Sequence, residues 1–315
     1  MADTSFGRLT SLPQVVQGYN PTVDYLRLAA AFMIVQFHAH GPLAMLGEPA
    51  VGFFVIVMVW FTMMGLRRPK QERGPYLRQR SLRLLYPFMV WVALHLLAKI
   101  VANGFDPVRT WTEFRPYLPP EGSFGQLWFL PWAVLVSALL AMLFWKRDPE
   151  IAGPGGALAG LAVCGIVTLA CLSAWSFLDL PLLAGLCILY TPSVVNGVVL
   201  FMARQRSGLL LAIAAALTVL ALGLQMAGLR GAPQIYVGVP VTILALTVAL
   251  PRLSWSGRAG TMAMDIYLCH VLVIAVMSGL LGIDSTTVAG SLLCCLGAFA
   301  VALVMQIEAV GRWLR

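Results

Sequence analysis

Four polar residues within one apolar stretch, residues 24–40, are the part of the sequence best suited to chemistry. Asp24, Arg27, His38 and His40 interrupt a run that is otherwise apolar enough to enter a bilayer. A charged side chain inside a membrane helix costs roughly 3 kcal/mol or more, so its presence points to a function. Arg27 and His38 lie about three helical turns apart, which places them on one face and roughly 16 Å apart along the axis. This spacing predicts a site for a long ligand, with a cation binding its anionic end and an imidazole acting at the other end.

The composition indicates an integral membrane protein. Of the 315 residues, 60% are hydrophobic and only 11% are charged, which is far from the balance found in soluble proteins. Apolar runs of about 20 residues, the length that crosses a bilayer, recur along the whole chain. We therefore expect a single integral membrane domain over residues 1–315, in which residues 1–22 form a cytoplasmic segment and are not a signal peptide.

The hydrophobic pattern predicts an all-α membrane protein with about ten transmembrane helices. Basic residues concentrate in every second loop, as they do in loops that face the cytoplasm. An even number of spans with all basic loops on one side places both termini in the cytoplasm. Arg27 then lies near the cytoplasmic end of the first helix, and His38 lies closer to the outer face. The expected spans are 23–46, 49–66, 82–104, 124–145, 155–176, 180–203, 207–227, 233–250, 260–282 and 287–310.

Other common functions find little support in the sequence. The net charge of +8 does not indicate a nucleic-acid partner, because the lysines and arginines lie in short loops beside apolar runs. The six cysteines all fall inside apolar runs, which predicts neither a disulfide framework nor a zinc site. His38 and His40 are two residues apart and point to different sides of a helix, so they do not form a metal-binding pair. We expect no metal and no tightly bound cofactor.

Two N-terminal segments resemble motifs of the bacterial membrane-bound acyltransferase-3 family, whose members move acyl groups onto surface glycans. Residues 24–27 followed by His38 are similar to its arginine–x10–histidine signature. Residues 60–65, WFTMMG, are a weak match to its Phe-Phe-x-x-Ser-Gly motif. Met64 stands where the family usually has serine, so a hydroxyl that could bond a substrate or a backbone carbonyl is missing at this position.

Three later segments extend the resemblance over nearly the whole chain. Arg80 and Arg83, just before the third expected helix, are similar to the family's Arg-x-x-Arg motif. Residues 127–130 resemble the start of its fourth helix, and residues 266–270, IYLCH, resemble its Tyr-Leu-x-His segment. The number of expected helices also matches, because family members usually have about ten.

The resemblance implies an O-acyltransferase of the cell inner membrane. Its donor would be acyl-CoA, with acetyl-CoA the expected form, and its acceptor a hydroxyl of a surface glycan or a lipid-linked saccharide. His38 would be the general base, since the ordinary pKa of histidine lies near working pH and a hydroxyl needs to lose its proton as it attacks. An acyl-histidine intermediate is a second possible route. The structural alternative is an interior histidine bonded to a backbone carbonyl.

The donor would be held by its phosphates at Arg27, Arg80 and Arg83. For Arg27 the alternative is a structural ion pair with Asp24, three residues away on the same helix face. For Arg80 and Arg83, which also share a face, the alternative is a plain topology signal or contact with lipid headgroups.

Two further groups of residues are candidates for supporting roles. Tyr267 and His270 share a face of the expected helix 260–282 and could orient His38 or contact the acceptor; a buried structural histidine is the alternative. In the outer loop 105–124, aromatic and charged side chains could form a platform that binds the acceptor sugar, or could simply belong to the interfacial aromatic belt. These loop residues are Trp111, Glu113 and Arg115.

Two functions of other classes compete with this hypothesis. A transporter or flippase for a glycan precursor would also have buried charges and a broken helix, and Pro192 lies in the middle of the sixth expected span. Against it, the chain has no paired broken helices in two related halves. A non-catalytic partner of a glycan-assembly complex is the third possibility, and Met64 favours it.

Overall fold

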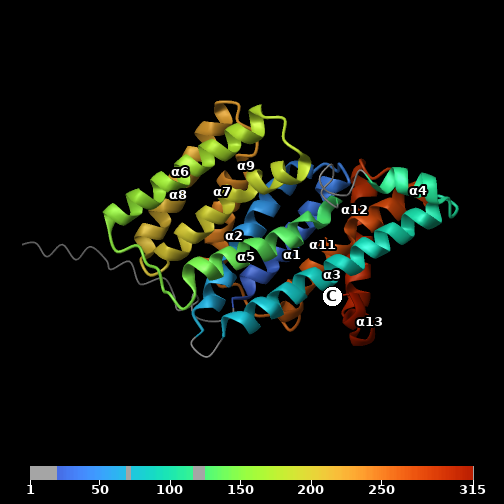
Figure 1. Ribbon diagram of the computed structural model, residues 1–315, viewed down its shortest axis with the longest axis horizontal. Coiled ribbons are helices and arrows are strands. Elements are labelled where there is room, and N and C mark those ends of the chain that lie inside the picture. Colours follow the sequence, from blue (N-terminus) through green and yellow to red (C-terminus); the bar gives the residue numbers. More distant parts are fainter. Residues whose placement is uncertain (1–19, 69–71, 116–124, 315) are drawn as a thin grey trace, which may run out of the picture.

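The computed structural model of the chain describes residues 20–68, 72–115 and 125–314. Most of the expected cytoplasmic N-terminal segment and part of the outer loop, residues 116–124, lie outside these ranges. All regular structure in the described ranges is helical (Figure 1). The elements are α1 (Pro21–His38), η2 (Ala44–Leu46), α2 (Gly47–Leu66), α3 (Arg73–Ala102), α4 (Pro107–Phe114), η4 (Gly125–Trp128), α5 (Phe129–Phe144), α6 (Pro154–Phe177), α7 (Leu182–Ala203), α8 (Ser207–Met226), α9 (Pro233–Tyr236), α10 (Gly238–Thr247), α11 (Ser256–Gly279), α12 (Val288–Met305) and α13 (Glu308–Leu314).

The helices confirm the prediction of an all-α membrane protein with about ten spans. Within the described ranges, eight helices are long and apolar enough to cross a membrane: α2, α3, α5, α6, α7, α8, α11 and α12. The two other expected spans correspond to α1, which carries Asp24 and Arg27, and to the consecutive short helices α9 and α10. The chain is thus a multi-pass membrane protein.

Three of the observed helices differ most from the expected spans. α1 ends at His38 instead of continuing to residue 46, because the chain turns there and His40 adopts a positive φ of 53°. α3 begins at Arg73, nine residues before the apolar run, so its first turns carry the basic residues. The span expected at 233–250 is divided at Val237 into two helices. Each difference reflects a local turn or a polar helical extension that hydrophobic periodicity does not register.

α1 is surrounded by other helices, which explains how a helix with two charged residues can lie inside the bundle. It packs against α11 most extensively and also against α2, α12 and α10. Figure 1 shows the long helices running side by side in one oblique direction, with α6 and α8 on one flank and α3 on the other. α3 packs mainly on α5 and leaves most of its surface outside the bundle. The central position of α1 gives its polar side chains protein neighbours on several sides.

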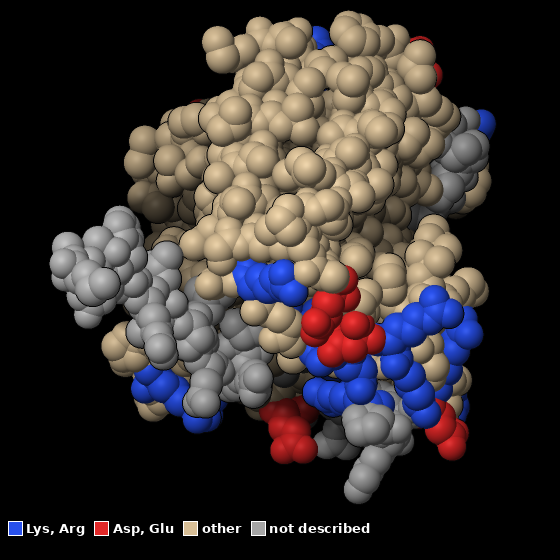
Figure 2. Space-filling view, turned by 90° about the vertical axis from the view of Figure 1, so that its left-hand side faces the viewer, with Lys and Arg blue, Asp and Glu red and all other residues tan. Residues whose placement is uncertain are grey.

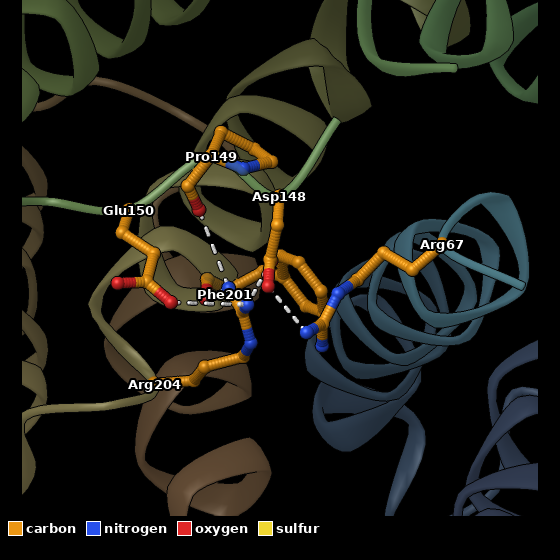
Figure 3. A network of polar contacts seen from close by, with 6 residues as sticks. All are labelled: Arg67, Asp148, Pro149, Glu150, Phe201 and Arg204. Atoms are coloured by element: carbon orange, nitrogen blue, oxygen red, sulfur yellow. Dashed lines mark hydrogen bonds and ion pairs between the residues drawn. The ribbon is translucent and has the colours of Figure 1, made fainter. Parts of the chain in front are cut away.

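An ion-pair cluster joins the ends of α2 and α7 to the connection between α5 and α6 (Figure 3). Asp148, in the connection between α5 and α6, accepts hydrogen bonds from Arg67 at the end of α2 and from Arg204 at the end of α7. The side chain of Arg204 is only 2% exposed, and Glu150 lies 3.7 Å from it. Its guanidinium also lies 4.1 Å from the centre of the Phe201 ring. We call this group of residues the Asp148 cluster.

The Asp148 cluster brings together basic residues that the sequence assigns to cytoplasmic loops. The backbone N–H of Lys146 also donates to the carbonyl of Leu66, 3.2 Å away, so the α5–α6 connection lies directly against the end of α2. Figure 2 shows that most of the charged side chains visible on one face gather below a broad uncharged surface, with a few at its upper edge. This one-sided distribution is typical of a protein whose basic loops face the cytoplasm.

Pro192 lies inside α7, where its ring removes one helical hydrogen bond. The structure keeps α7 as one helix from Leu182 to Ala203. Gln234 of α9 bonds α7 on both sides of the proline: its amide nitrogen donates to the carbonyl of Leu189 at 2.6 Å, and its amide oxygen accepts from the hydroxyl of Ser193 at 2.9 Å. A buried glutamine therefore joins α9 to α7 directly beside Pro192.

Candidate active site

A cavity of about 650 Å³ lies between α1, α2, α3, α11 and the start of α5. Arg27 and His38 both line it, as their spacing on one helix face predicts. Arg80 and Arg83 of α3 reach it from the opposite side, and Tyr267 lines it from α11. Residues from five separate segments of the sequence therefore converge on one hollow.

The cavity is polar at one end and apolar along its walls. Three arginines and one aspartate line it (Asp24, Arg27, Arg80 and Arg83), which gives a net charge of +2. The apolar lining comes mainly from α2, with one or two residues each from α1, α5 and α11: Val51, Phe54, Val57, Met58, Phe61, Ile34, Phe129, Ala133, Ala263 and Met264. Such a cavity suits a ligand with an anionic head and an extended, less polar arm.

The first arginine of the cavity, Arg27, is paired with Asp24. Its Nη1 donates to Asp24 Oδ1 at 3.1 Å, and the side chains are 25% and 14% exposed. Gly260 of α11 makes room for this pair, because a Cβ there would collide with Asp24 Oδ1 and would lie 2.8 Å from Arg27 Nη1. Arg27 therefore forms an ion pair with Asp24 and also lines the cavity.

Arg80 is held by two hydroxyls and not by a carboxylate. Its Nε donates to Ser137 Oγ of α5 at 2.7 Å, and its Nη2 donates to Thr62 Oγ1 of α2 at 2.8 Å. Arg83 is exposed and lines the mouth of the same cavity. Neither arginine forms an ion pair with a residue in the described ranges.

His38 is half-buried at the last residue of α1, where its ring faces the cavity. In the part of the chain that the structure describes, neither ring nitrogen has a hydrogen-bond partner. The nearest polar ring is that of His270 on α11, with ring centres 5.0 Å apart and planes inclined by 42°. The imidazole of His38 is therefore available to a ligand.

His270 is fully buried behind His38. Its Nδ1 lies 2.8 Å from the carbonyl of Tyr267, to which it donates, so Nε2 carries the lone pair of the neutral ring. Nε2 is buried without a hydrogen-bond partner among the described residues. The hydroxyl of Tyr267 donates to the carbonyl of Gln126, whose amide nitrogen lies 3.2 Å from Nε2 of His95. These contacts fix the α11 side of the cavity against α3 and the start of α5.

The sequence model of the family described as "Acyltransferase domain", acyltransferase-3, matches residues 20–307. This chain belongs to the acyltransferase-3 family. The match runs from α1 through α12 and includes every residue that lines the cavity, so the protein is a membrane acyltransferase. No curated protein and no solved structure matches the chain.

The three residues predicted to bind the acceptor lie apart from the cavity of this acyltransferase. Trp111 and Glu113 are on α4, and Arg115 follows at its end. Glu113 bonds Arg109 Nε at 3.1 Å and Lys99 Nζ at 3.2 Å. The hydrogen bonds from Arg109 and Lys99 hold the pKa of Glu113 below its usual range, so this carboxylate is ionised and already occupied. Trp111 is exposed, and its role in acceptor binding stays a prediction.

Three polar residues of the acyltransferase site have no clear signature in the sequence. Thr62, Ser137 and Gln126 are buried and lie within or beside apolar runs. Single hydroxyls in membrane helices commonly bond their own helix backbone, which gives no hint of a partner on another helix. Within the described residues, no group of three or more His, Cys, Asp or Glu side chains could hold a metal ion, and the six cysteines are unpaired.

Proposed function

We propose that this protein transfers an acyl group, with acetyl as the expected one, from acyl-CoA to a hydroxyl of a surface glycan or lipid-linked saccharide at the inner membrane. One observation supports it above all: three arginines and an imidazole open onto the same cavity, and one of the arginines, Arg27, lies roughly 16 Å from His38 along the same helix. Arg27, Arg80 and Arg83 bind the phosphates of the donor on the cytoplasmic side. The pantetheine arm extends along the apolar wall and presents the thioester to His38.

In this proposal His38 acts as general base. It removes the proton of the acceptor hydroxyl while the oxygen forms a bond to the acyl carbon. The carbon–sulfur bond then breaks, and the sulfur leaves with the proton that the imidazolium returns. Because both ring nitrogens of His38 are free of protein partners in the described structure, one can meet the hydroxyl while the other turns toward His270. The products are an ester and free CoA, so protons and electrons balance.

The decisive experiment compares two neighbouring histidines. A deletion strain is complemented with wild-type protein, with His38→Ala or with His40→Ala, and acylation of the surface glycans is measured by mass spectrometry. His40 is exposed, follows the end of α1 and does not line the cavity, so its variant is a matched control. We expect His38→Ala to abolish acylation and His40→Ala to retain it, with equal amounts of both proteins in the membrane.

The same strains separate this function from its competitors. The mass lost from the glycan in the deletion strain identifies the acyl group. Wild-type acylation in the His38→Ala strain would show that His38 is not the base. Unchanged acylation in the deletion strain itself would favour a transporter or a non-catalytic partner over the enzyme.

A further inference from the structure

Three partly or fully buried arginines of this protein have different hydrogen-bond partners. Arg204 contacts two carboxylates in the Asp148 cluster, and Arg27 contacts Asp24. Arg80 instead contacts only hydroxyls, those of Thr62 and Ser137, among the described residues. Inside a membrane protein an arginine is normally paired, because an isolated charge is costly. No carboxylate among the described residues neutralises Arg80, so its positive charge is available to a negatively charged ligand.

The two hydroxyls can only accept hydrogen bonds from Arg80. Thr62 Oγ1 gives its own proton to the carbonyl of Met58 at 2.7 Å, and Ser137 Oγ gives its proton to the carbonyl of Ala133 at 2.7 Å. Each carbonyl belongs to the same helix as its hydroxyl, one turn earlier: Met58 lies on α2 with Thr62, and Ala133 lies on α5 with Ser137. Each hydroxyl is thereby oriented with its lone pairs toward α3. The pair fixes the direction of the guanidinium through Nε and Nη2 without cancelling its charge.

We propose that Thr62 and Ser137 are positioning residues that direct the unneutralised Arg80 into the cavity, where a phosphate of the acyl donor supplies the missing negative charge. This inference rests on the proposed function, because it assumes a donor that carries phosphates. Nη1 has no partner among the described residues and remains available to the ligand. A fixed guanidinium loses less freedom when it binds a phosphate than a mobile one does.

The proposal also bears on the unusual residue in the second motif. Met64 offers no hydroxyl, and its side chain packs against the apolar core. Thr62, two residues earlier in the same segment, does offer one, and it reaches Arg80. The segment thus still provides a hydroxyl to this acyltransferase site, at a different position from the serine of the family motif.

Binding of radiolabelled acetyl-CoA to the purified full-length protein tests the idea without requiring the acceptor. We expect Thr62→Val and Ser137→Ala each to raise the dissociation constant about tenfold, the effect of losing one hydrogen bond to a charged group. Thr62→Ser keeps the hydroxyl and should restore wild-type binding. Thr242→Val is the matched control, because Thr242 is equally buried, donates to the carbonyl four residues earlier at 2.7 Å and touches no arginine.

A double-mutant cycle with Arg80→Ala separates positioning from a general structural effect. If Thr62 acts through Arg80, Thr62→Val should weaken binding no further in the Arg80→Ala protein. Equal losses in both backgrounds, or wild-type affinity in Thr62→Val and Ser137→Ala, would overturn the positioning role while the proposed function stands. Failure of the wild-type protein to bind acetyl-CoA would overturn both.

Discussion

The rings of His38 and His270 lie 5.0 Å apart, on α1 and α11 respectively. Nδ1 of His270 is committed to the carbonyl of Tyr267, and Nε2 is left as a buried acceptor without a partner among the described residues. A rotation that turns one ring N–H of His38 toward Nε2 of His270 would let it donate to that acceptor. Its other nitrogen would then be fixed as the basic one and would face the cavity. In the mechanism proposed above, His270 would thus set which nitrogen of His38 receives the proton of the acceptor.

The first prediction concerns this pair of histidines. His270→Gln should lower kcat about 100-fold while the KM for acetyl-CoA stays close to the wild-type value, because the change affects proton transfer and not donor binding. Steady-state kinetics with the acceptor identified in the deletion strain would measure both constants. His95→Gln is the control, since His95 lies at the far end of the same hydrogen-bonded chain and does not contact His38. Equal loss of kcat in both variants would argue against a specific role of His270.

The second prediction concerns the close approach of α11 to the Arg27–Asp24 pair. Gly260→Ala adds a methyl group that must displace Asp24 or Arg27, so we expect acetyl-CoA to bind about tenfold more weakly. Gly279→Ala, near the end of the same helix, places its methyl group in open space and should bind normally. Equilibrium binding of acetyl-CoA to the two purified variants measures this difference. Tight binding by the Gly260→Ala protein would mean that the pair is not needed in its present position.

The third prediction compares two arginines on α3. Arg83 lines the cavity mouth, whereas Arg78 is exposed and does not. Arg83→Ala should raise the dissociation constant for acetyl-CoA several-fold at low ionic strength, and less in high salt, because exposed charges are screened. Arg78→Ala should have little effect under either condition. If both variants behaved alike, Arg83 would be only one of several cations that attract anions to this surface.

The fourth prediction concerns stability and the Asp148 cluster. Asp148→Asn leaves the buried guanidinium of Arg204 with a weaker partner, Glu150 at 3.7 Å. Breaking a fully buried ion pair costs roughly 3–5 kcal/mol, but Asp148 is 40% exposed, so we expect about 1–2 kcal/mol and a lower thermal midpoint. Glu150→Gln should change the midpoint much less. Acetyl-CoA affinity, measured below the midpoint, should stay unchanged in both variants, because the Asp148 cluster does not line the cavity.

The sequence predicts the main features of the site because they depend on one helix at a time. Helical geometry alone predicts that Arg27 and His38 share one face of α1. The order of the spans alone predicts which loops lie on the same side of the membrane. The family resemblance, which the match over residues 20–307 confirms, adds Arg80 and Arg83. What these signals cannot supply is the distance between side chains on different helices.

The contacts that the sequence does not predict all depend on such distances. Thr62 and Thr242 each bond a carbonyl four residues earlier, yet only Thr62 meets an arginine. Their local sequences are equally apolar, so no pattern within one helix distinguishes them. The break at Val237 and the early end of α1 are missed for a different reason: the expected spans follow apolar content, whereas Gly41 and Pro42 follow the end of α1 and Gly238 and Pro240 follow the break.

In the proposed function, the separation of Arg27 from His38 has a consequence for how an acyl group from a cytoplasmic donor would reach a sugar on the outer side. In the proposed orientation the nucleotide part of the donor never leaves the cytoplasmic half of the membrane. Only the far end of its flexible arm travels outward, because that arm spans the interval between the two side chains. Delivery to the outer side would then require neither a moving gate nor an ion gradient, and the spent carrier could withdraw along the path by which it entered.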